Sequence, residues 1–388
     1  MSEKILPTRK FECPNCKTSD YRMSTLEIGT AGVDTCPKCG AQMKIVGDTP
    51  PDWLRKIQEI VGRELYVDDF VAFDNKAEFE VAPSSGSLQK VMKNLRKIGY
   101  ISAARGTPFS SKLIIMKSPV YPREKLWPHL LLFCITFLSV LAAGYFILFE
   151  SLTFAMMFAI SLMLMLSSHE LGHMISAWKN GIDATPPYFI PFPSALGTMG
   201  AIVSIRSPPP TKDALVEMGA AGPLSGFLIA IPLALLGLFL SIPSPSGLQL
   251  PASPLIFLLF QLALFGQAAT PLLIHPLAFA GWVVFFLTFF NLLPAGQLDG
   301  GHVARGLLRM ETHHQLTIGI GLLMLFSGVL FASYPFWFWG FLILLAFRDY
   351  HSGPLDEVSA LSKRGRLMAV ASWIVFILCL PIPVGGEF

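Results

Sequence analysis

Apolar segments long enough to cross a lipid bilayer recur along this chain from about residue 127 onward. A run of about 20 predominantly apolar residues is the length that a membrane-spanning helix needs. Only 14% of the 388 residues are charged, whereas soluble globular proteins carry about 25%. The mean hydropathy is correspondingly positive, at +0.56. We therefore predict a polytopic α-helical integral membrane protein.

The apolar segments predict about six to seven transmembrane helices. The expected spans lie near residues 128–149, 152–177, 216–240, 275–294, 315–333, 335–347 and 367–384. Residues 335–347 are short for a span. Residues 254–266 are also apolar, and their length favours a re-entrant or interfacial helix.

The Lys and Arg residues of the membrane region predict its orientation. All 11 fall on one side if the N-terminus lies in the cytosol, and the segments 241–274 and 333–335 on the other side carry none. Cytosolic loops of membrane proteins are enriched in Lys and Arg, so we expect a multi-pass protein of the cell membrane with a cytosolic N-terminus. The 11 residues are Arg123, Lys125, Lys179, Arg206, Lys212, Arg305, Arg309, Arg348, Lys363, Arg364 and Arg366.

Four cysteines near the N-terminus form two C-x2-C pairs that are 19 residues apart: Cys13, Cys16, Cys36 and Cys39. This spacing predicts a zinc ribbon over residues 1–48, in which four thiolates hold one structural zinc ion. The alternative is two unrelated cysteine pairs, such as a redox pair. Zinc-binding thiolates must be reduced, so the ribbon also favours a cytosolic N-terminus.

Residues 49–118 have the pattern of a small soluble α/β domain. Apolar residues recur with helical period in residues 53–61 and 88–95. Runs typical of β-strands occupy residues 66–73, 77–81, 100–104 and 112–116. Nothing here has catalytic spacing, so we expect an accessory domain, followed by a membrane domain over residues 119–388.

The N-terminal part is not predicted to bind nucleic acid. Residues 1–118 carry 18 basic and 14 acidic residues without a dense basic stripe. A rival interpretation makes the ribbon a tether for nucleic acid or for a cytosolic protein. This balance of charge argues against nucleic acid. We expect the ribbon to dock a cytosolic protein.

The second predicted span ends in a metal-binding motif, His169-Glu170-Leu171-Gly172-His173. Residues four apart share one face of a helix, so His169 and His173 can bind one ion, while Glu170 can reach the attacking water. Zinc with a neighbouring carboxylate base is the chemistry of peptide hydrolysis. The alternative is a polar patch at a helix contact, but ionisable groups inside an apolar span are costly without a function.

A catalytic zinc site needs a third protein ligand and an open position. The best candidate lies in residues 291–302, where Pro294 and Gly296 break the fourth predicted span at its cytosolic end and Asp299 follows with little nearby to neutralise it. The second and fourth spans run in the same direction, so Asp299 and the histidine motif reach the same depth. His302 is a weaker candidate ligand. His313 and His314 are predicted to be a solvated cytosolic pair.

Together the two motifs resemble those of the site-2 protease family of intramembrane zinc metalloproteases. Its signatures match His169–His173 and Leu298-Asp299-Gly300, and the fuller string 291–302, Asn-Leu-Leu-Pro-Ala-Gly-Gln-Leu-Asp-Gly-Gly-His, is most similar to the archaeal and chloroplast branch. The segment 220–224, Ala-Ala-Gly-Pro-Leu, also fits the family pattern. The likeness covers roughly residues 128–350.

The resemblance implies an intramembrane zinc metalloendopeptidase that cleaves transmembrane or membrane-adjacent segments of proteins, as in regulated intramembrane proteolysis. It implies that His169, His173 and Asp299 bind the catalytic zinc and that Glu170 is the catalytic base. It also implies that Asn291 holds the substrate strand or steadies the oxyanion. Two zinc ions are therefore expected, one catalytic and one in the ribbon.

Residues 184–210 alternate turn residues with β-branched and aromatic ones, which predicts a hairpin beside the site. Its edge is expected to receive an unwound substrate as an added strand. The alternative is a surface loop that lies on the membrane.

A rival function is zinc binding in a membrane protein without hydrolysis, either a transporter or an inactive protease relative. A transporter would spread ionisable residues through several spans, whereas here they concentrate in two motifs. An intact Glu170 argues against an inactive relative.

Overall fold

The computed structural model describes residues 6–28, 31–73, 75–82, 86–107, 109–122, 124–248, 252–268, 270–330, 334–346 and 350–383. The chain forms two compact units. The N-terminal unit comprises Met1–Pro122 and Leu355–Ala360, and the helical unit comprises Arg123–Pro354 and Leu361–Phe388. Two of the 11 basic residues behind the predicted orientation, Arg123 and Arg348, lie outside the described residues.

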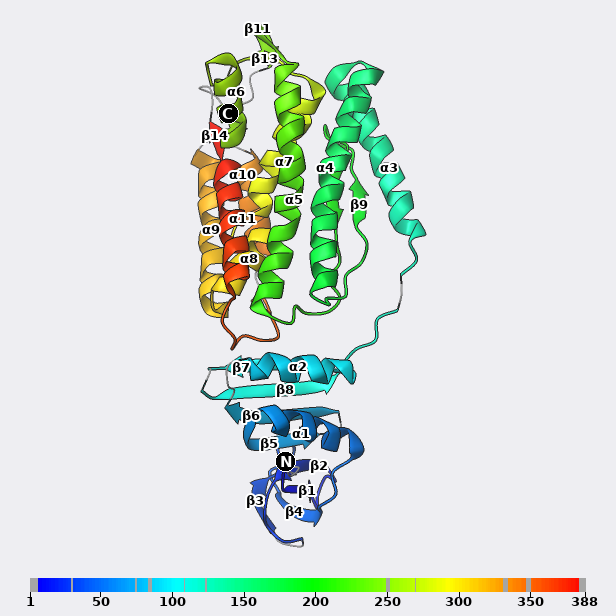
Figure 1. Ribbon diagram of the computed structural model, residues 1–388, viewed down its shortest axis with the longest axis vertical. Coiled ribbons are helices and arrows are strands. Elements are labelled where there is room, and N and C mark those ends of the chain that lie inside the picture. The colour runs from blue at the N-terminus through cyan, green and yellow to red at the C-terminus, as the bar shows by residue number, and fades with distance from the viewer. Residues whose placement is uncertain are drawn as a thin grey trace. The chain divides into compact units, whose positions relative to one another are not determined.

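The N-terminal unit is an antiparallel sheet with two amphipathic helices (Figure 1). The eight strands follow the order β3-β4-β1-β2-β5-β6-β8-β7. The strands are β1 Thr8–Glu12, β2 Ser19–Met23, β3 Ala31–Thr35, β4 Gln42–Gly47, β5 Tyr66–Phe73, β6 Lys76–Ala82, β7 Tyr100–Gly106 and β8 Ser111–Lys117. The helices are α1 Asp52–Glu64 and α2 Ser87–Lys97.

The predicted ribbon and the predicted α/β segment share this one sheet. Strand β2 pairs with β5, with Tyr21 opposite Ala72 and Arg22 opposite Val71. The apolar faces of α1 and α2 pack on the half of the sheet formed by β5 to β8, where Phe70 and other apolar residues are buried. The four strands predicted between residues 66 and 116 are all present.

A short segment from far along the chain completes the N-terminal unit. The Ala104 N–H of β7 donates to the Leu355 carbonyl (2.8 Å), and the Glu357 N–H donates to the Ala104 carbonyl (3.2 Å). This is one parallel bridge, between Ala104 and Asp356. Asp356 is fully buried and accepts hydrogen bonds from the N–H groups of Val358 and Ser359. Residues 355–360 therefore cover the outer edge of β7.

The helical unit contains the predicted spans as helices. Its helices are α3 Trp127–Ala143 with a π-helical continuation η1 Gly144–Phe149, α4 Leu152–Lys179, α5 Lys212–Phe239, α6 Leu255–Phe265, α7 Pro276–Asn291, α8 Asp299–Leu307, α9 Met310–Leu330, α10 Tyr334–Ala346 and α11 Lys363–Leu378. Four stretches among the described residues are long and apolar enough to cross a membrane: Trp127–Phe149, Leu152–Lys179, Lys212–Phe239 and Met310–Leu330. The helices α6, α7 and α10 are apolar but shorter, so a count of six to seven spans stays a prediction.

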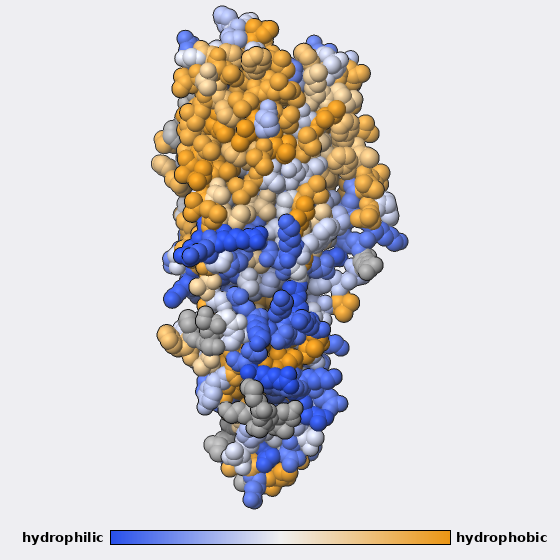
Figure 2. Space-filling model, in the orientation of Figure 1, coloured by the Kyte–Doolittle hydropathy of each residue, from blue (hydrophilic) through white to orange (hydrophobic). Residues whose placement is uncertain are grey.

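The surface of the helical unit is apolar, as expected for a protein in lipid. Figure 2 shows apolar side chains over most of its visible face, and exposed examples include Leu130, Phe239 and Phe326. Its core lies where α4, α5 and α7 pack together (Figure 1). Because both the inside and the outside are apolar, this unit is a membrane protein.

The predicted hairpin is also present. Strands β9 (Tyr188–Pro191) and β10 (Thr198–Ile202) pair antiparallel, with Ile202 opposite Tyr188. Strand β9 packs against α3, where the Phe189 and Phe133 rings meet edge to face at 5.1 Å. Three further short strands follow, β11 Ile242–Leu248, β12 Ala252–Pro254 and β13 Leu272–Leu273, and β14 Pro381–Pro383 pairs with β12.

Candidate metal centres

Three polar side chains meet at the end of α4 and the start of α8. The His169 Nε2 lies 3.0 Å from the His173 Nε2 and 3.2 Å from an Asp299 carboxylate oxygen. The other Asp299 oxygen lies 3.3 Å from the His173 Nε2. The predicted convergence of two distant motifs is therefore present.

The spacing of these atoms fits a zinc ion. Bonds of about 2.0–2.1 Å to histidine nitrogen and carboxylate oxygen give a tetrahedron with edges of about 3.3 Å. The two imidazole nitrogens lie 3.0 Å apart, and each lies 3.2 or 3.3 Å from one of the two Asp299 oxygens, so every separation is close to such an edge. Three ligands on one face leave a fourth position for a reactant, which distinguishes catalytic from structural zinc.

Hydrogen bonding fixes how His173 faces the other ligands. Its Nδ1–H donates to the Met218 carbonyl of α5 at 2.8 Å. In this tautomer the Nε2 carries a lone pair and points toward His169 and Asp299. A backbone carbonyl in this role is the usual outer partner of a metal-binding histidine.

Small residues of α5 let that helix approach the site closely. Gly219, Gly222 and Gly226 are spaced so that they share one helix face. A Cβ on Gly222 would overlap the His173 imidazole, and a Cβ on Gly219 would lie 2.6 Å from the Asp299 carbonyl oxygen. The family-like segment 220–224 thus lies on the helix that forms the wall of the site.

The turn between α7 and α8 brings Asp299 to the histidines. After α7 ends at Asn291, Gly296 adopts a positive φ of 55° and donates its N–H to the Thr317 Oγ1 of α9 (2.9 Å). Gly300 packs directly on the Leu292 carbonyl, where no side chain would fit. The helix break predicted at Pro294 and Gly296 is present, and Asp299 becomes the first residue of α8.

Two further predicted site residues are not part of this cluster. Glu170 follows His169 in α4 and is 8% exposed. Asn291 is half-buried at the C-terminal end of α7, and its side chain forms no hydrogen bond to any residue that the structure describes. The roles predicted for Glu170 and Asn291 therefore stay predictions.

The remaining histidines of this region form a separate cluster. The His302 Nδ1 hydrogen-bonds to the His351 Nε2 at 2.8 Å, so His302 is engaged away from the ligand triad. The prediction that His313 is solvated is wrong, because His313 is 1% exposed and donates to the Gly301 carbonyl at 3.1 Å. Burial lowers the pKa of His351 to about 3. Sequence reasoning missed His351, since neither spacing nor a motif marks it.

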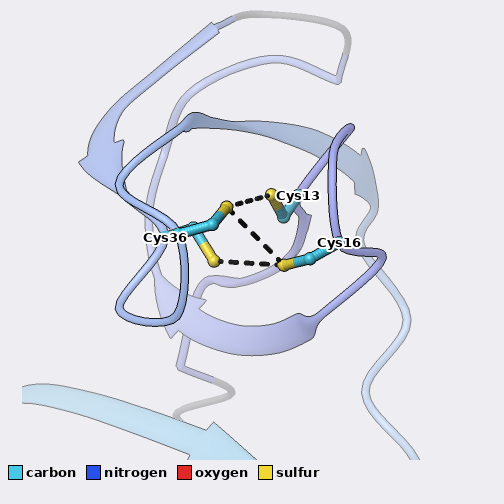
Figure 3. Close-up of side chains that lie close together, drawn as sticks. Cys13, Cys16 and Cys36 are labelled. Carbon is cyan, nitrogen blue, oxygen red and sulfur yellow. Dashed lines mark hydrogen bonds between the residues drawn. The ribbon is translucent and has the colours of Figure 1, made fainter.

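The four N-terminal cysteines converge as predicted (Figure 3). The Sγ atoms of Cys13 and Cys39 lie 3.4 Å apart, those of Cys16 and Cys36 lie 3.5 Å apart, and those of Cys16 and Cys39 lie 3.7 Å apart. Zinc–sulfur bonds of about 2.3 Å give a tetrahedron with edges of about 3.8 Å. A hydrogen bond with the Thr18 hydroxyl lowers the pKa of Cys16 to about 6, which favours the thiolate that zinc needs.

A known protein family matches part of the helical unit. The family model "Peptidase family M50" matches residues 157–333, which include all three members of the His169, His173 and Asp299 cluster. Residues 157–333 thus resemble a Peptidase family M50 domain. The resemblance to site-2 proteases is thereby confirmed, and the three clustered side chains lie within the matched residues.

Curated plant proteins are similar to part of this chain. They include "Probable zinc metalloprotease EGY1, chloroplastic" of Arabidopsis thaliana (30% identical over 225 residues), its EGY2 counterpart (31% over 230 residues) and EGY1 of Oryza sativa subsp. japonica (32% over 237 residues). These matches cover 55–57% of this chain and 39–40% of the relatives. The chain thus spans about two-fifths of the length of the curated relatives it matches. No solved structure matches the chain.

Proposed function

We propose that this protein is an intramembrane zinc endopeptidase that hydrolyses peptide bonds in transmembrane or membrane-adjacent protein segments, as in regulated intramembrane proteolysis. The observation that carries the proposal is the triangle of His169, His173 and Asp299 beside Glu170 at the end of a membrane-length helix. The M50 domain and the relatives named as probable zinc metalloproteases support it.

The chemistry divides between the ion and the chain. His169, His173 and Asp299 would hold zinc, which when bound supplies a Lewis acid for the scissile carbonyl and acidifies the attacking water. Glu170 accepts the proton of that water and passes it to the leaving amine. The two histidines and Glu170 are each less than 10% exposed, so these side chains work largely away from bulk water.

A substrate helix must unwind before its peptide bond can be attacked. We propose that β10 receives the unwound segment as an added strand, because a strand edge offers backbone hydrogen bonds to an extended chain. Ile202 in β10 is 57% exposed. Ile202→Pro or Val203→Pro should therefore slow cleavage of a helical substrate about 10-fold or more, since each removes a backbone N–H. Unchanged cleavage by both variants would exclude this role for the hairpin.

Several finer assignments belong to the same proposal. Asn291, at the end of α7, is proposed to hold the substrate strand or steady the oxyanion. Residues 1–48 are proposed as a zinc ribbon that docks a cytosolic protein, residues 49–118 as an accessory domain and residues 119–388 as the protease domain. The proposed setting is the cell membrane, with six to seven spans and a cytosolic N-terminus. The distribution of Lys and Arg supports this orientation.

The decisive experiment is cleavage of a helical membrane substrate by detergent-purified protein, with and without a strong chelator. Activity should disappear with the chelator and return with added zinc. Glu170→Gln should keep zinc and lose at least about 1,000-fold in rate, because removal of the proton acceptor leaves the ligands in place. His169→Ala and Asp299→Ala should lose both zinc and activity. Full activity of Glu170→Gln would refute the mechanism.

A further inference from the structure

The helix that supplies the third ligand is short and weakly anchored by itself. Helix α8 has nine residues, its N-cap Leu298 offers no side-chain hydrogen bond, and Asp299 is its first residue. Isolated helices of this length are unstable. The position of the Asp299 carboxylate therefore depends on what holds α8 from outside.

One residue outside α8, His351, contacts this helix at two points, once through its ring and once through its backbone carbonyl. The His351 ring contacts His302 through the 2.8 Å hydrogen bond, and the Arg305 Nε–H donates to the His351 carbonyl at 3.3 Å. His302 and Arg305 are three residues apart, so they lie on the same face of α8. His351 is 7% exposed and Arg305 is 2% exposed, which makes these contacts interior ones.

The direction of the histidine hydrogen bond follows from its neighbours. The Gly353 N–H donates to the His351 Nδ1 at 2.9 Å, so this nitrogen is an acceptor. A neutral imidazole then carries its proton on Nε2. The His351 Nε2–H must therefore donate to the His302 Nδ1. The backbone turn 351–353 thus fixes the tautomers of both rings.

We propose that His351 is a positioning residue for the metal centre, which holds α8 through His302 and Arg305 and thereby sets the place of the Asp299 carboxylate. The inference rests on the proposed function, because it assumes that Asp299 binds zinc. His302 then connects His351 to α8, the helix that begins with Asp299. Removal of a group that directly hydrogen-bonds a ligand typically lowers metal affinity about 10- to 100-fold, and a residue that acts through His302 is expected at the lower end of that range.

Two amide substitutions separate this role from mere packing. In His351→Asn the amide lies near the position of Nδ1, so it can still accept from Gly353 but cannot reach His302. In His351→Gln the amide extends to the position of Nε2 and can still donate to His302. His314→Asn is the matched control, because the His314 ring contacts Tyr350 and makes no hydrogen bond to any described residue.

The measurement is zinc affinity by chelator competition in the full chain, in a Glu170→Gln background that does not turn over. His351→Asn should weaken zinc binding about 10-fold or more, whereas His351→Gln and His314→Asn should stay within about 2-fold. Cobalt(II) spectra give a second readout, because only the ribbon produces a thiolate charge-transfer band. The visible bands of the His/Asp site should change in His351→Asn alone.

The outcomes distinguish the two proposals. Wild-type zinc affinity and cobalt spectrum in His351→Asn would overturn the positioning role and leave the proposed function intact. Equal losses in His351→Asn and His351→Gln would also overturn it, since packing alone would then explain the effect. Absence of metal binding at the His/Asp site in the Glu170→Gln parent would instead refute the proposed function.

Discussion

At the scale of single residues, the site depends on glycines, which have no side chain, as much as on the residues proposed to bind zinc. Gly222 of α5 lies against the His173 imidazole, and an added Cβ would overlap that ring. Gly222→Ala should therefore displace the ring and weaken zinc binding by about 10-fold or more, although alanine is the better helix former. Chelator competition would measure this loss.

The matched control for Gly222→Ala is Gly319→Ala in α9. Gly319 is also helical, and an added Cβ there would meet no atom within 4 Å. Its zinc affinity should equal that of the parent. If Gly222→Ala also bound zinc with the affinity of the parent, the close approach of α5 to His173 would not be needed for metal binding.

At the scale of elements, the sequence predicts most of what local periodicity controls. The pairing of His169 with His173 follows from their spacing in α4, and the ribbon follows from the spacing of its cysteines. The helix break before Asp299 was predictable from Pro294 and Gly296, whereas the choice of Asp299 as a ligand came from the resemblance to the protease family. His351 was not, because it meets His302 across 49 residues and two intervening helices. The burial of His313 was likewise not predictable, because its hydrogen bond to the Gly301 carbonyl follows from no sequence pattern.

The ribbon is an element whose stability should depend on its metal. Its small core contains two of the four cysteines, Cys13 and Cys36, packed with Phe11, Met43 and Ile45. Cys13→Ser should therefore lose zinc and sharply increase hydrogen exchange in β1 to β4, while α1 and α2 keep their protection. Cys134→Ser, on the exposed side of α3, should change neither. Unaltered protection of β1 to β4 in Cys13→Ser would argue against a structural metal.

The same element should respond to acid in a defined direction. The pKa of Cys16 falls from an ordinary value of 9.0 to about 6, chiefly through its hydrogen bond with Thr18. Folding therefore favours the thiolate of Cys16, although hydrogen bonds among the thiols raise the pKa of Cys39 to about 12. The Cys16 contribution is complete above pH 9 and disappears as the pH falls through about 6. Zinc should remain in the ribbon at pH 7 and be released more readily below pH 6, as absorbance of a zinc indicator would report.

At the scale of the whole molecule, the N-terminal unit is built from two distant stretches of chain. Residues 355–360, which follow α10 in sequence, supply the bridge to Ala104 and the fully buried Asp356. The Asp356 Oδ1 accepts from the N–H groups of Val358 and Ser359, whereas its Oδ2 has no hydrogen-bond partner among the described residues. The carboxylate therefore shapes the turn that lets this segment lie along β7.

Asp356→Ala should loosen that segment, because it leaves two backbone N–H groups without their acceptor. The expected loss is about 1–3 kcal/mol of local stability, seen as faster hydrogen exchange of the Ala104 amide in the full chain. Asp356→Asn retains an acceptor at Oδ1 and removes a buried charge, so its exchange should stay close to that of the parent. If Asp356→Ala left the Ala104 exchange rate unchanged, residues 355–360 would be a passive covering of the β7 edge. If it accelerated exchange only in residues 355–360, the β7 edge would be stable without them.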